Sequence, residues 1–448
     1  MEDYRAALEE LYRLRLFGTK LGLNNIRRLL ELLGNPERDL DFYHIAGTNG
    51  KGSTAAILQR LLMTTRLRVG LFTSPHLDDF RERIRIGSRP ISPGETAAGV
   101  REILPLLDRV ARTPGCSHPT YFEAVTALAC RYFCRKGAGA VVWEVGLGGR
   151  LDATNAVTPR ISVITTIGLE HQAYLGKTLD RIAREKGGIV KRSIPLVTAV
   201  SPGRGLDRLR RICRSRRAPL VEVKKLYRAR SISRGLEGQV IAFSGPHRSY
   251  PEIFLPLPGD HQVSNCLTAL AAWERGDPKA GEIPPGRVRT AVGAVAWPGR
   301  FEYFPGPPEV IVDGAHNRNG ARVLAATLRD LLPGRPLILI IGVLGDKDAK
   351  EICRPLLPLF GKTIAVTPPS ARALAASRLA RIIRSQAGER KIPVLVRKSL
   401  ESALAYCYRN YLPGREGAGV PPVICVTGSL RLIGPARKYI FSRPGSKQ

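Results

Sequence analysis

The chain has 448 residues, of which 44% are hydrophobic; because single hydrophobic cores stop growing near about 250 to 300 residues, this length predicts two domains. An excess of 70 Lys and Arg over 38 Asp and Glu gives a formal net charge of +32, which predicts attraction to anions: nucleotides, polycarboxylates, nucleic acid or acidic membrane surfaces. The sequence excludes a membrane-spanning helix, because no run approaches the ~20 apolar residues that a span needs.

Basic residues are spread along the chain, with concentrations in RLRRICRSRR, KKLYRARSISR and SARALAASRLARIIR. Surfaces that stack nucleic-acid bases carry aromatic residues between the cations, and these segments have few. We therefore interpret them as a solvated, arginine-rich surface rather than a specific nucleic-acid site.

The first residues, MEDYRAALEELYRLRLFG, alternate charged and apolar groups as an amphipathic helix does, without the apolar segment of a signal peptide. The 8 cysteines include no C-x-x-C pair, and Cys130 and Cys134 fall at helical spacing within an apolar pattern. We expect reduced cysteines in the core of a soluble, cytoplasmic, monomeric protein.

Short β-branched apolar runs alternate with helical patterns along most of the chain, which is typical of buried parallel strands with helices on both sheet faces. The sequence therefore predicts an α/β fold with two series of strands. The predicted strands are FYHIA, VGLFT, AVVWEVG, ISVITTIG and IPLVTAV, and later EVIVDGA, PLILIIGVLG, KTIAVT, IPVLV and PVICVTG.

The region between the two series has a different character. Residues 223–256 resemble a β-meander, residues 261–275 resemble a helix, and WPGRFEYFPGPPE is rich in Pro and Gly. We place the domain boundary near Pro298 to Pro308, which gives an N-terminal domain of residues 1–297 and a C-terminal domain of residues 298–448.

A glycine-rich turn follows the first predicted strand and precedes an apolar helix predicted from Thr54. Its backbone N–H groups predict an anion nest at a helix N-terminus, with a lysine for phosphates and a hydroxyl for Mg²⁺. The candidate nucleotide-binding residues are Gly47, Thr48, Asn49, Gly50, Lys51, Gly52, Ser53 and Thr54. The spacing departs from G-x-x-x-x-G-K-[ST], since position 45 is Ile and a glycine precedes the serine. A plain strand-to-helix turn, a kinase, a GTPase and a ligase all stay open.

Acidic and histidine side chains follow two other predicted strands. Glu144 ends the run VVWE, where a parallel sheet presents side chains to its ligand and where a carboxylate suits Mg²⁺. Glu170 and His171 end the next strand, and Lys186 follows on a helix. A lone histidine at a strand end is more often structural than a ligand.

Ten stretches occur in the order found in one known family, over residues from about 20 to 435. They are GTNGKGS, FTSPHLDDFRERIRI, TYFEAVTALA, EVGLGGRLDATN, GLEHQAYLGKTLDRIAREKGGIVK, PGDHQVSNCLTALAA, WPGRFE, VDGAHNRNGARVL, GVLGDKD and VTGSLRLIG. The chain thereby resembles the folylpolyglutamate synthase/dihydrofolate synthase family of Mur-type ligases. The resemblance implies an N-terminal P-loop ATPase domain with a mostly parallel sheet and a smaller, Rossmann-like C-terminal domain that binds glutamate, joined at PGR.

The resemblance also implies site residues for ATP and two Mg²⁺ ions. In the N-terminal domain, Lys51 and Ser53 match phosphate and metal contacts, Ser74 and Glu144 match Mg²⁺ ligands, and His171 matches a ligand of the second metal. Lys186 matches a lysine that the family carbamylates, which turns a cation into a carboxylate. The chain departs from the family in Glu170, where Asp is usual, and in Gly187, where Ala is common.

Further candidate residues come from the later motifs. The resemblance puts Asn265 near the base, Arg300 on the phosphates, and Asp313 and His316 in the closing C-terminal domain. Alternatively, Arg300 forms an interdomain salt bridge and Asp313 caps the following helix.

The implied reaction transfers the ATP γ-phosphoryl group to a folate or dihydropteroate carboxylate, and the amine of L-glutamate then attacks the acyl phosphate. We expect Lys51, His171, Lys186 and His316 to be the catalytic residues, and closure of the domains about Pro298 to Arg300. A nucleic-acid-binding ATPase and a ligase of cell-wall precursors are the competing predictions, and a pure binding module is the least favoured.

Overall fold

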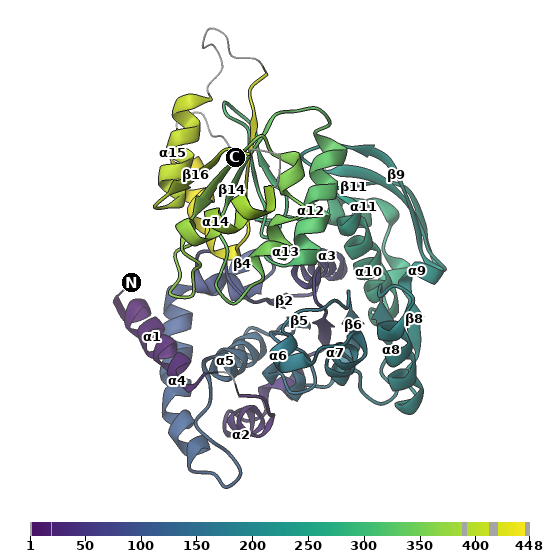
Figure 1. Ribbon diagram of the computed structural model, residues 1–448. Coiled ribbons are helices and arrows are strands. Elements are labelled where there is room, and N and C mark those ends of the chain that lie inside the picture. The colour runs from purple at the N-terminus through teal and green to yellow at the C-terminus, as the bar shows by residue number, and fades with distance from the viewer. Residues whose placement is uncertain (1, 19, 388–391, 412–419, 444–448) are drawn as a thin grey trace. The chain divides into compact units, whose positions relative to one another are not determined.

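The computed structural model describes residues 2–18, 20–387, 392–411 and 420–443 (Figure 1). The chain forms two compact units. Unit 1 comprises residues 1–230, 241–254 and 262–295, and unit 2 comprises residues 231–240, 255–261 and 296–448. Within the described ranges, no helix has both the length and the apolarity to cross a membrane.

Unit 1 is built on an eight-stranded sheet in the order β4-β3-β2-β5-β1-β6-β7-β8. The strands are β1 (Phe42–Ala46), β2 (Val69–Phe72), β3 (Ile84–Ile86), β4 (Arg89–Pro90), β5 (Ala140–Glu144), β6 (Pro159–Ile164), β7 (Leu196–Thr198) and β8 (Leu220–Glu222). The pairs from β2 to β8 are parallel, and β3 and β4 add an antiparallel edge. β1 is buried at every position, which agrees with its continuous apolar run.

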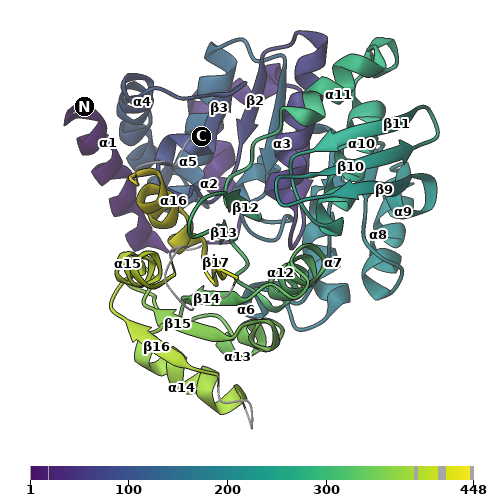
Figure 2. The same cartoon turned by 90° about the horizontal axis from the view of Figure 1, so that it is seen from above.

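Helices cover both faces of this sheet. They are α1 (Glu2–Arg13), α2 (Asn24–Leu32), α3 (Lys51–Leu62), α4 (Pro93–Ala111), α5 (Tyr121–Arg135), α6 (Gln172–Leu175), α7 (Leu179–Lys186), α8 (Arg204–Ser215), α9 (Val223–Leu226), α10 (Asp260–Gly276) and α11 (Pro285–Gly293). One core gathers α2, α4 and α5 against Phe42 and Trp143. On the opposite face α3 contacts β2 and β5, and α10 brings Gly276 against Tyr43. Figure 2 shows α1 beside α4, outside the layer that touches the sheet.

Three consecutive strands form a separate sheet in the order β11-β10-β9, as Figure 2 shows. They are β9 (Arg228–Arg234), β10 (Gln239–Ser244) and β11 (Ser249–Leu255). The predicted strands of this region are confirmed, although its first residues form the short helix α9 instead.

Unit 2 holds a six-stranded sheet in the order β12-β13-β17-β14-β15-β16. The strands are β12 (Glu302–Phe304), β13 (Val310–Val312), β14 (Leu337–Ile341), β15 (Lys362–Val366), β16 (Val394–Arg397) and β17 (Val423–Thr427), and only β12 runs antiparallel to its neighbour. The helices are α12 (Arg318–Leu331), α13 (Ala349–Cys353), α14 (Ala376–Ala387), α15 (Leu400–Asn410) and α16 (Ile433–Phe441). α12, α13 and α14 share one core with alternate strand residues such as Leu339 and Ile341.

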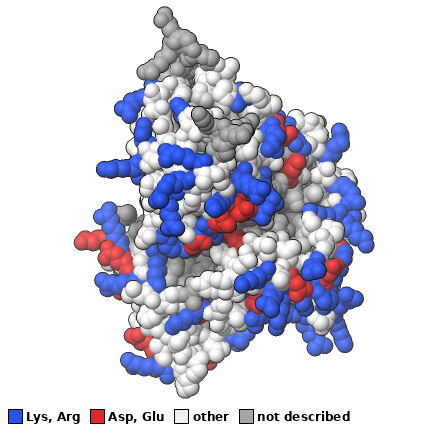
Figure 3. Space-filling model, in the orientation of Figure 1, with Lys and Arg blue, Asp and Glu red and all other residues white. Residues whose placement is uncertain are grey.

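All five strands predicted in each series are present, so the α/β fold with a large, mostly parallel sheet and a smaller second one is confirmed. Six of the eight cysteines are buried, but Cys116 and Cys134 lie at the edge of a core rather than inside it. Lys and Arg side chains are scattered widely over the face of the molecule in Figure 3, with fewer acids between them.

Candidate active site

The glycine-rich turn lies between β1 and α3, at the carboxyl ends of the parallel strands. Gly47 has φ 153° and Gly50 has φ 86°. A Cβ on Gly47 would lie 1.9 Å from Thr165 Oγ1, and one on Gly50 would lie 2.3 Å from Asn265 Oδ1. Both positions therefore need glycine, for conformation and for space.

Two threonines that follow β6 hold this turn in place. Thr166 Oγ1 accepts from Asn49 N at 3.0 Å, and Thr165 Oγ1 donates to Asn49 O at 2.6 Å. The backbone adds Thr48 N donating to Thr166 O at 2.8 Å. We did not single out these threonines from the sequence; their signal is a pair of hydroxyls directly after an apolar run. β6 ends at Ile164, so the prediction that Glu170 and His171 end this strand is wrong.

The helix after the turn begins at Lys51, three residues before the predicted start, because Gly50 in the left-handed region allows the chain to enter the helix there. Lys51 Nζ donates to the carbonyl oxygens of Gly47 and Thr48 at 3.2 and 3.4 Å. Ser53 is buried, and the buried Thr54 Oγ1 has no hydrogen-bond partner among the described residues. A helix N-terminus with a lysine and an unsatisfied hydroxyl is suited to a phosphate group.

Lys186, at the end of α7, reaches the same turn. Its buried Nζ donates to Gly47 O at 2.9 Å. Burial and, to a smaller extent, the charge of Lys51 lower the pKa of Lys186 to about 7, against the carboxylates of Glu170 and Asp152. The structure therefore brings Lys51 and Lys186 together, as the sequence predicted only by resemblance.

Glu144 and Ser74 meet at the ends of two adjacent strands. β2 and β5 pair in parallel register, with Phe72 opposite Trp143. Buried Glu144 accepts a hydrogen bond from Ser74 N at 2.9 Å. A buried carboxylate thus lies at the carboxyl ends of the strands, and its role as a Mg²⁺ ligand stays a prediction.

His171 lies in the loop before α6 with φ 50°. Its Nε2 is 3.8 Å from Glu170 Oε1, and its side chain is 41% exposed. Over the described ranges, no three His, Cys, Asp or Glu side chains gather closely enough to cage a metal ion. Mg²⁺ commonly binds one or two carboxylates and completes its coordination shell with water and substrate phosphate. The carboxylate and hydroxyl groups near the turn therefore suit Mg²⁺ binding of this kind.

Asn265 lies on α10 against the turn, where its Nδ2 donates to Gln262 Oε1 at 2.9 Å. The buried Gln262 Nε2 has no partner within the described part of the chain. Gln262 is a further residue that sequence reasoning missed, and its place one helical turn before Asn265 is the signal that could have found it.

Asp152 was also missed, although it stands in the quoted motif GRLDATN. Its buried carboxylate accepts from Leu147 N at 2.7 Å and from Thr154 N at 3.0 Å. Burial raises the pKa of Asp152, while these hydrogen bonds oppose the rise. Asp152 therefore fixes the loop that follows Glu144.

Unit 2 carries the remaining predicted residues. Asp313 accepts from Phe301 N and from Ala315 N, both at 2.8 Å. Burial raises the pKa of Asp313, and the charge of Arg300 opposes this rise. The alternative that Asp313 caps the following helix is wrong, because Asn317 is the N-cap of α12.

Arg300 precedes Asp313 in the sequence, and His316 follows it. Arg300 Nη1 donates to Gly299 O at 3.3 Å, and His316 Nδ1 lies 2.8 Å from Gly314 O. The alternative that Arg300 forms an interdomain salt bridge stays a prediction. Through its hydrogen bonds from Phe301 N and Ala315 N, Asp313 links the turn that carries Arg300 to the turn that carries His316.

Two family models match the chain: the Mur ligase middle domain over residues 94–273 and the Mur ligase glutamate ligase domain over residues 299–430. A dihydrofolate synthase/folylpolyglutamate synthase of Mycobacterium tuberculosis is 37% identical over 445 residues, covering 94% of this chain and 90% of that protein. Its Bacillus subtilis counterpart is 36% identical over 345 residues, covering 76% and 79%.

Solved structures give the same likeness. The Mycobacterium tuberculosis folylpolyglutamate synthase complexed with ADP and AMPPCP has a TM-score of 0.88 at 33% identity, covering 98% of this chain and 99% of that one. Escherichia coli FolC in complex with DHPP and ADP has a TM-score of 0.84 at 26% identity, covering 98% of each chain.

Proposed function

Because this chain belongs to the folylpolyglutamate synthase/dihydrofolate synthase family of Mur-type ligases, we propose that it uses ATP to join L-glutamate to the carboxylate of folate and of dihydropteroate. It is an ATP-dependent ligase. The observation that carries the proposal is the turn of Gly47 to Gly50, with Lys51 and Lys186 on one carbonyl oxygen. The relatives named above support neither a nucleic-acid-binding ATPase nor a ligase of cell-wall precursors.

The turn and the start of α3 would hold the ATP phosphates. The N–H groups of this segment and the Lys51 ammonium supply positive charge where phosphoryl transfer gathers negative charge. The unsatisfied Thr54 hydroxyl supports this assignment. Asn265, packed against Gly50, would lie near the base.

Ser53, Ser74, Glu144 and His171 would hold Mg²⁺, which neutralises phosphate charge when it is bound. The burial of Glu144 and its contact with Ser74 support a fixed ligand set on the strand ends. Glu170, next to His171, is one methylene longer than the usual Asp, so its carboxylate reaches further from the backbone.

Lys186 would enter the metal site as a carbamate. A neutral amine is the form that reacts with carbon dioxide: its lone pair forms the C–N bond, and a proton leaves to solvent. A Lys186 pKa of about 7 makes that form available near neutral pH. The resulting carboxylate would also remove the repulsion between two adjacent ammonium groups.

Residues 298–448 would form the glutamate-ligase domain. The contacts of Asp313 support a positioning role, since they fix the turns that carry Arg300 and His316. Arg300 would meet phosphate oxygens, and His316 would act at the reacting groups after the closure expected from the sequence.

An aromatic surface in unit 1 would take the planar rings of the acceptor. Phe17 stacks on His118 with ring centroids 3.9 Å apart, and the Arg15 guanidinium lies 4.0 and 5.0 Å from the centroids of Tyr12 and Tyr121. Stacked rings beside a cation suit a flat acceptor with a negatively charged tail.

In this reaction the acceptor carboxylate oxygen attacks the γ-phosphorus and ADP leaves. The glutamate nitrogen then attacks the acyl carbon, loses a proton and expels phosphate. We further propose a cytoplasmic monomer without a nucleic-acid partner, and the eight free cysteines support a reducing compartment.

The test is ADP release by the purified protein with Mg-ATP and L-glutamate, without acceptor, with dihydropteroate, or with tetrahydrofolate. We expect acceptor-dependent ADP release and a product heavier by one glutamate residue, both lost in Lys51→Ala. ADP release that ignores both acceptors and rises with added RNA or DNA would contradict the proposal.

A further inference from the structure

The amino edge of the large sheet, opposite the phosphate loop, carries cations that the ligase reaction does not use. Lys191 precedes β7, and Arg216 lies between α8 and β8. Because β7 and β8 run parallel, both residues lie near the start of their strands. Arg27, on α2, lines a cavity that also includes Thr158, the residue before β6.

Lys191 and Arg216 donate to two backbone carbonyl oxygens, in segments that the Asn155 side chain links. Lys191 Nζ donates to Asn155 O at 3.1 Å, and Arg216 Nη1 donates to Gly188 O at 3.3 Å. Asn155 Nδ2 donates to Gly188 O at 3.3 Å, and Ser193 N donates to Arg216 O at 2.9 Å. The two cations are therefore held next to each other, and each uses one N–H donor in a hydrogen bond to a carbonyl oxygen.

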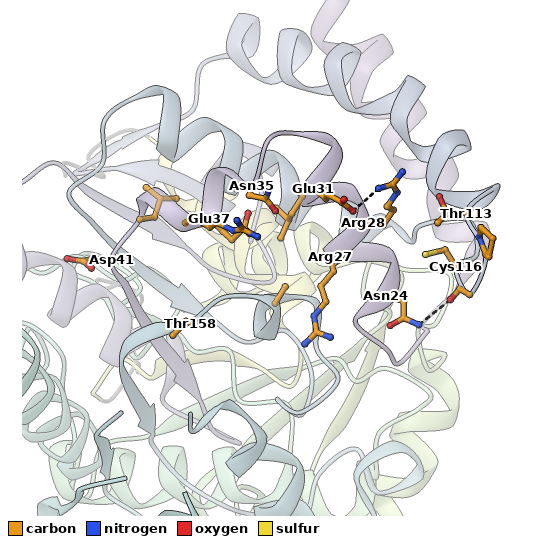
Figure 4. A pocket seen from close by; sticks show the side chains of 16 residues that line it. Asn24, Arg27, Arg28, Glu31, Asn35, Glu37, Asp41, Thr113, Cys116 and Thr158 are labelled. Atoms are coloured by element: carbon orange, nitrogen blue, oxygen red, sulfur yellow. Dashed lines mark hydrogen bonds and ion pairs between the residues drawn. The ribbon is translucent and has the colours of Figure 1, made fainter. Parts of the chain in front are cut away.

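Arg27 faces an open space rather than a partner. The cavity that it lines has a volume of about 900 Å³ and includes Ala156, the neighbour of Asn155. In Figure 4 the Arg27 guanidinium points away from the ion pair of Arg28 and Glu31. Arg27 is exposed, and its side chain makes no hydrogen bond or ion pair with any residue that the structure describes.

The acids near this cavity do not neutralise the three cations. Glu31 pairs with Arg28 at 2.7 Å, and Asp41 pairs with Arg160 at 2.7 Å. Burial raises the pKa of Glu37, the third acid that lines the cavity, and among the described residues no ion pair joins it to these cations. Burial, together with the charges of Arg216 and Arg27, lowers the pKa of Lys191 to about 8, with no carboxylate acting against them. Like charges gathered at a half-buried position are unfavourable unless an anion joins them.

We propose that Arg27, Lys191 and Arg216 bind a phosphate group at the amino edge of unit 1. Two N–H donors of Lys191, four of Arg216 and five of Arg27 remain available for a ligand. Phosphate oxygens accept hydrogen bonds from ammonium and guanidinium groups. The cavity beside Arg27 has room for an organic body, so inorganic phosphate and a phosphate monoester share the required chemistry.

The test measures the thermal unfolding midpoint of the full chain without ATP or folate. All proteins carry Lys51→Met, which weakens binding at the phosphate loop, and the Arg27→Gln variant separates any phosphate binding that remains there. Sodium phosphate and ribose 5-phosphate are each compared with sodium chloride at the same ionic strength. We expect phosphate at saturation to raise the midpoint by about 2 °C or more. A larger shift with ribose 5-phosphate would identify a phosphate monoester, and equal shifts would identify the bare phosphate group.

Arg27→Gln and Lys191→Met should abolish the shift, whereas Arg214→Gln, which removes an exposed arginine of α8, should keep it. If Lys191→Met does not fold, Arg27→Gln decides alone, because the Arg27 side chain contributes no hydrogen bond to the described part of the fold. A shift that chloride reproduces, or one that survives in Arg27→Gln, overturns the proposal. The readout does not depend on ligase activity.

Discussion

Lys51 and Lys186 donate to the same atom, the carbonyl oxygen of Gly47, over 3.2 and 2.9 Å. One neutral acceptor does not compensate two ammonium groups, so each charge disfavours the other. Burial, with the charge of Lys51, lowers the pKa of Lys186 to about 7. This pair makes Lys186 a reactive amine near neutral pH.

Removing the Lys186 side chain tests the carbamate. Lys186→Ala should lower ligase turnover by about 100-fold or more, because a metal-site group is lost. Formate or acetate should restore part of the activity by supplying a carboxylate. Steady-state ADP release measures both effects, and Lys177→Ala, at an exposed lysine of the same segment, should be normal. Full turnover in Lys186→Ala without added acid would exclude the assignment.

Gly50→Ala tests the shape of the phosphate turn. The new Cβ would lie 2.3 Å from Asn265 Oδ1, at a φ of 86°. We expect a loss of about 1 to 3 kcal/mol in the free energy of unfolding, measured with urea, and weaker ATP binding. Gly94→Ala is the matched control, since its Cβ would meet open space at the start of α4. Wild-type stability in Gly50→Ala would show that the turn can relax.

Asp313→Asn tests the link between the two turns of unit 2. An amide replaces one of two acceptor oxygens with an N–H₂ group, so a buried backbone N–H loses its partner. The cost should be about 1 to 3 kcal/mol. We expect turnover to fall while the urea transition of unit 1 is unchanged; Glu401→Gln, on the surface of α15, should change neither. Unaltered kinetics in Asp313→Asn would argue against a positioning role.

Glu274 gives unit 1 a pH-dependent stability. Burial raises the pKa of Glu274 to about 7, while the hydrogen bond from Tyr227 Oη opposes this rise. Since the folded pKa is above the ordinary value, its stabilising effect is complete below about 4.5 and is lost as pH rises through about 7.

Glu274→Gln keeps an acceptor for Tyr227 and cannot ionise. Relative to the wild type, it should therefore gain stability as pH rises from 5 to 8, as measured by urea unfolding. Glu252→Gln, at an exposed residue of β11, should leave the pH profile unchanged. Parallel profiles for the wild type and Glu274→Gln would contradict the prediction.

The strands and the phosphate turn could be predicted because their signals are local. A buried parallel strand is a continuous apolar run, and Gly47 and Gly50 mark backbone that other residues avoid. The apolar pattern predicts a helix start at Thr54 instead of Lys51, because Lys51 and Gly52 interrupt that pattern although they are helical.

Long-range contacts were not predictable from such patterns. Thr165 and Thr166 bind Asn49 from more than one hundred positions away. The pair of hydroxyls after an apolar run is visible in the sequence, but it does not indicate which segment these side chains contact. Gly187 is a second case. A Cβ at this position would lie 2.5 Å from Ile212 Cδ1, so the close approach of α8 favours Gly over the Ala that is common in the family. The sequence around Gly187 does not indicate this contact.

The position of β1 between β5 and β6 has a consequence for synthesis of the protein. Gly47 leaves the ribosome 139 residues ahead of Lys186, which donates to it. At about 5 to 20 residues per second this delay is on the order of ten seconds. A nascent chain released before Thr165 would carry the whole glycine motif without Thr165, Thr166 and Lys186, whose contacts shape it, and we expect it to retain no nucleotide.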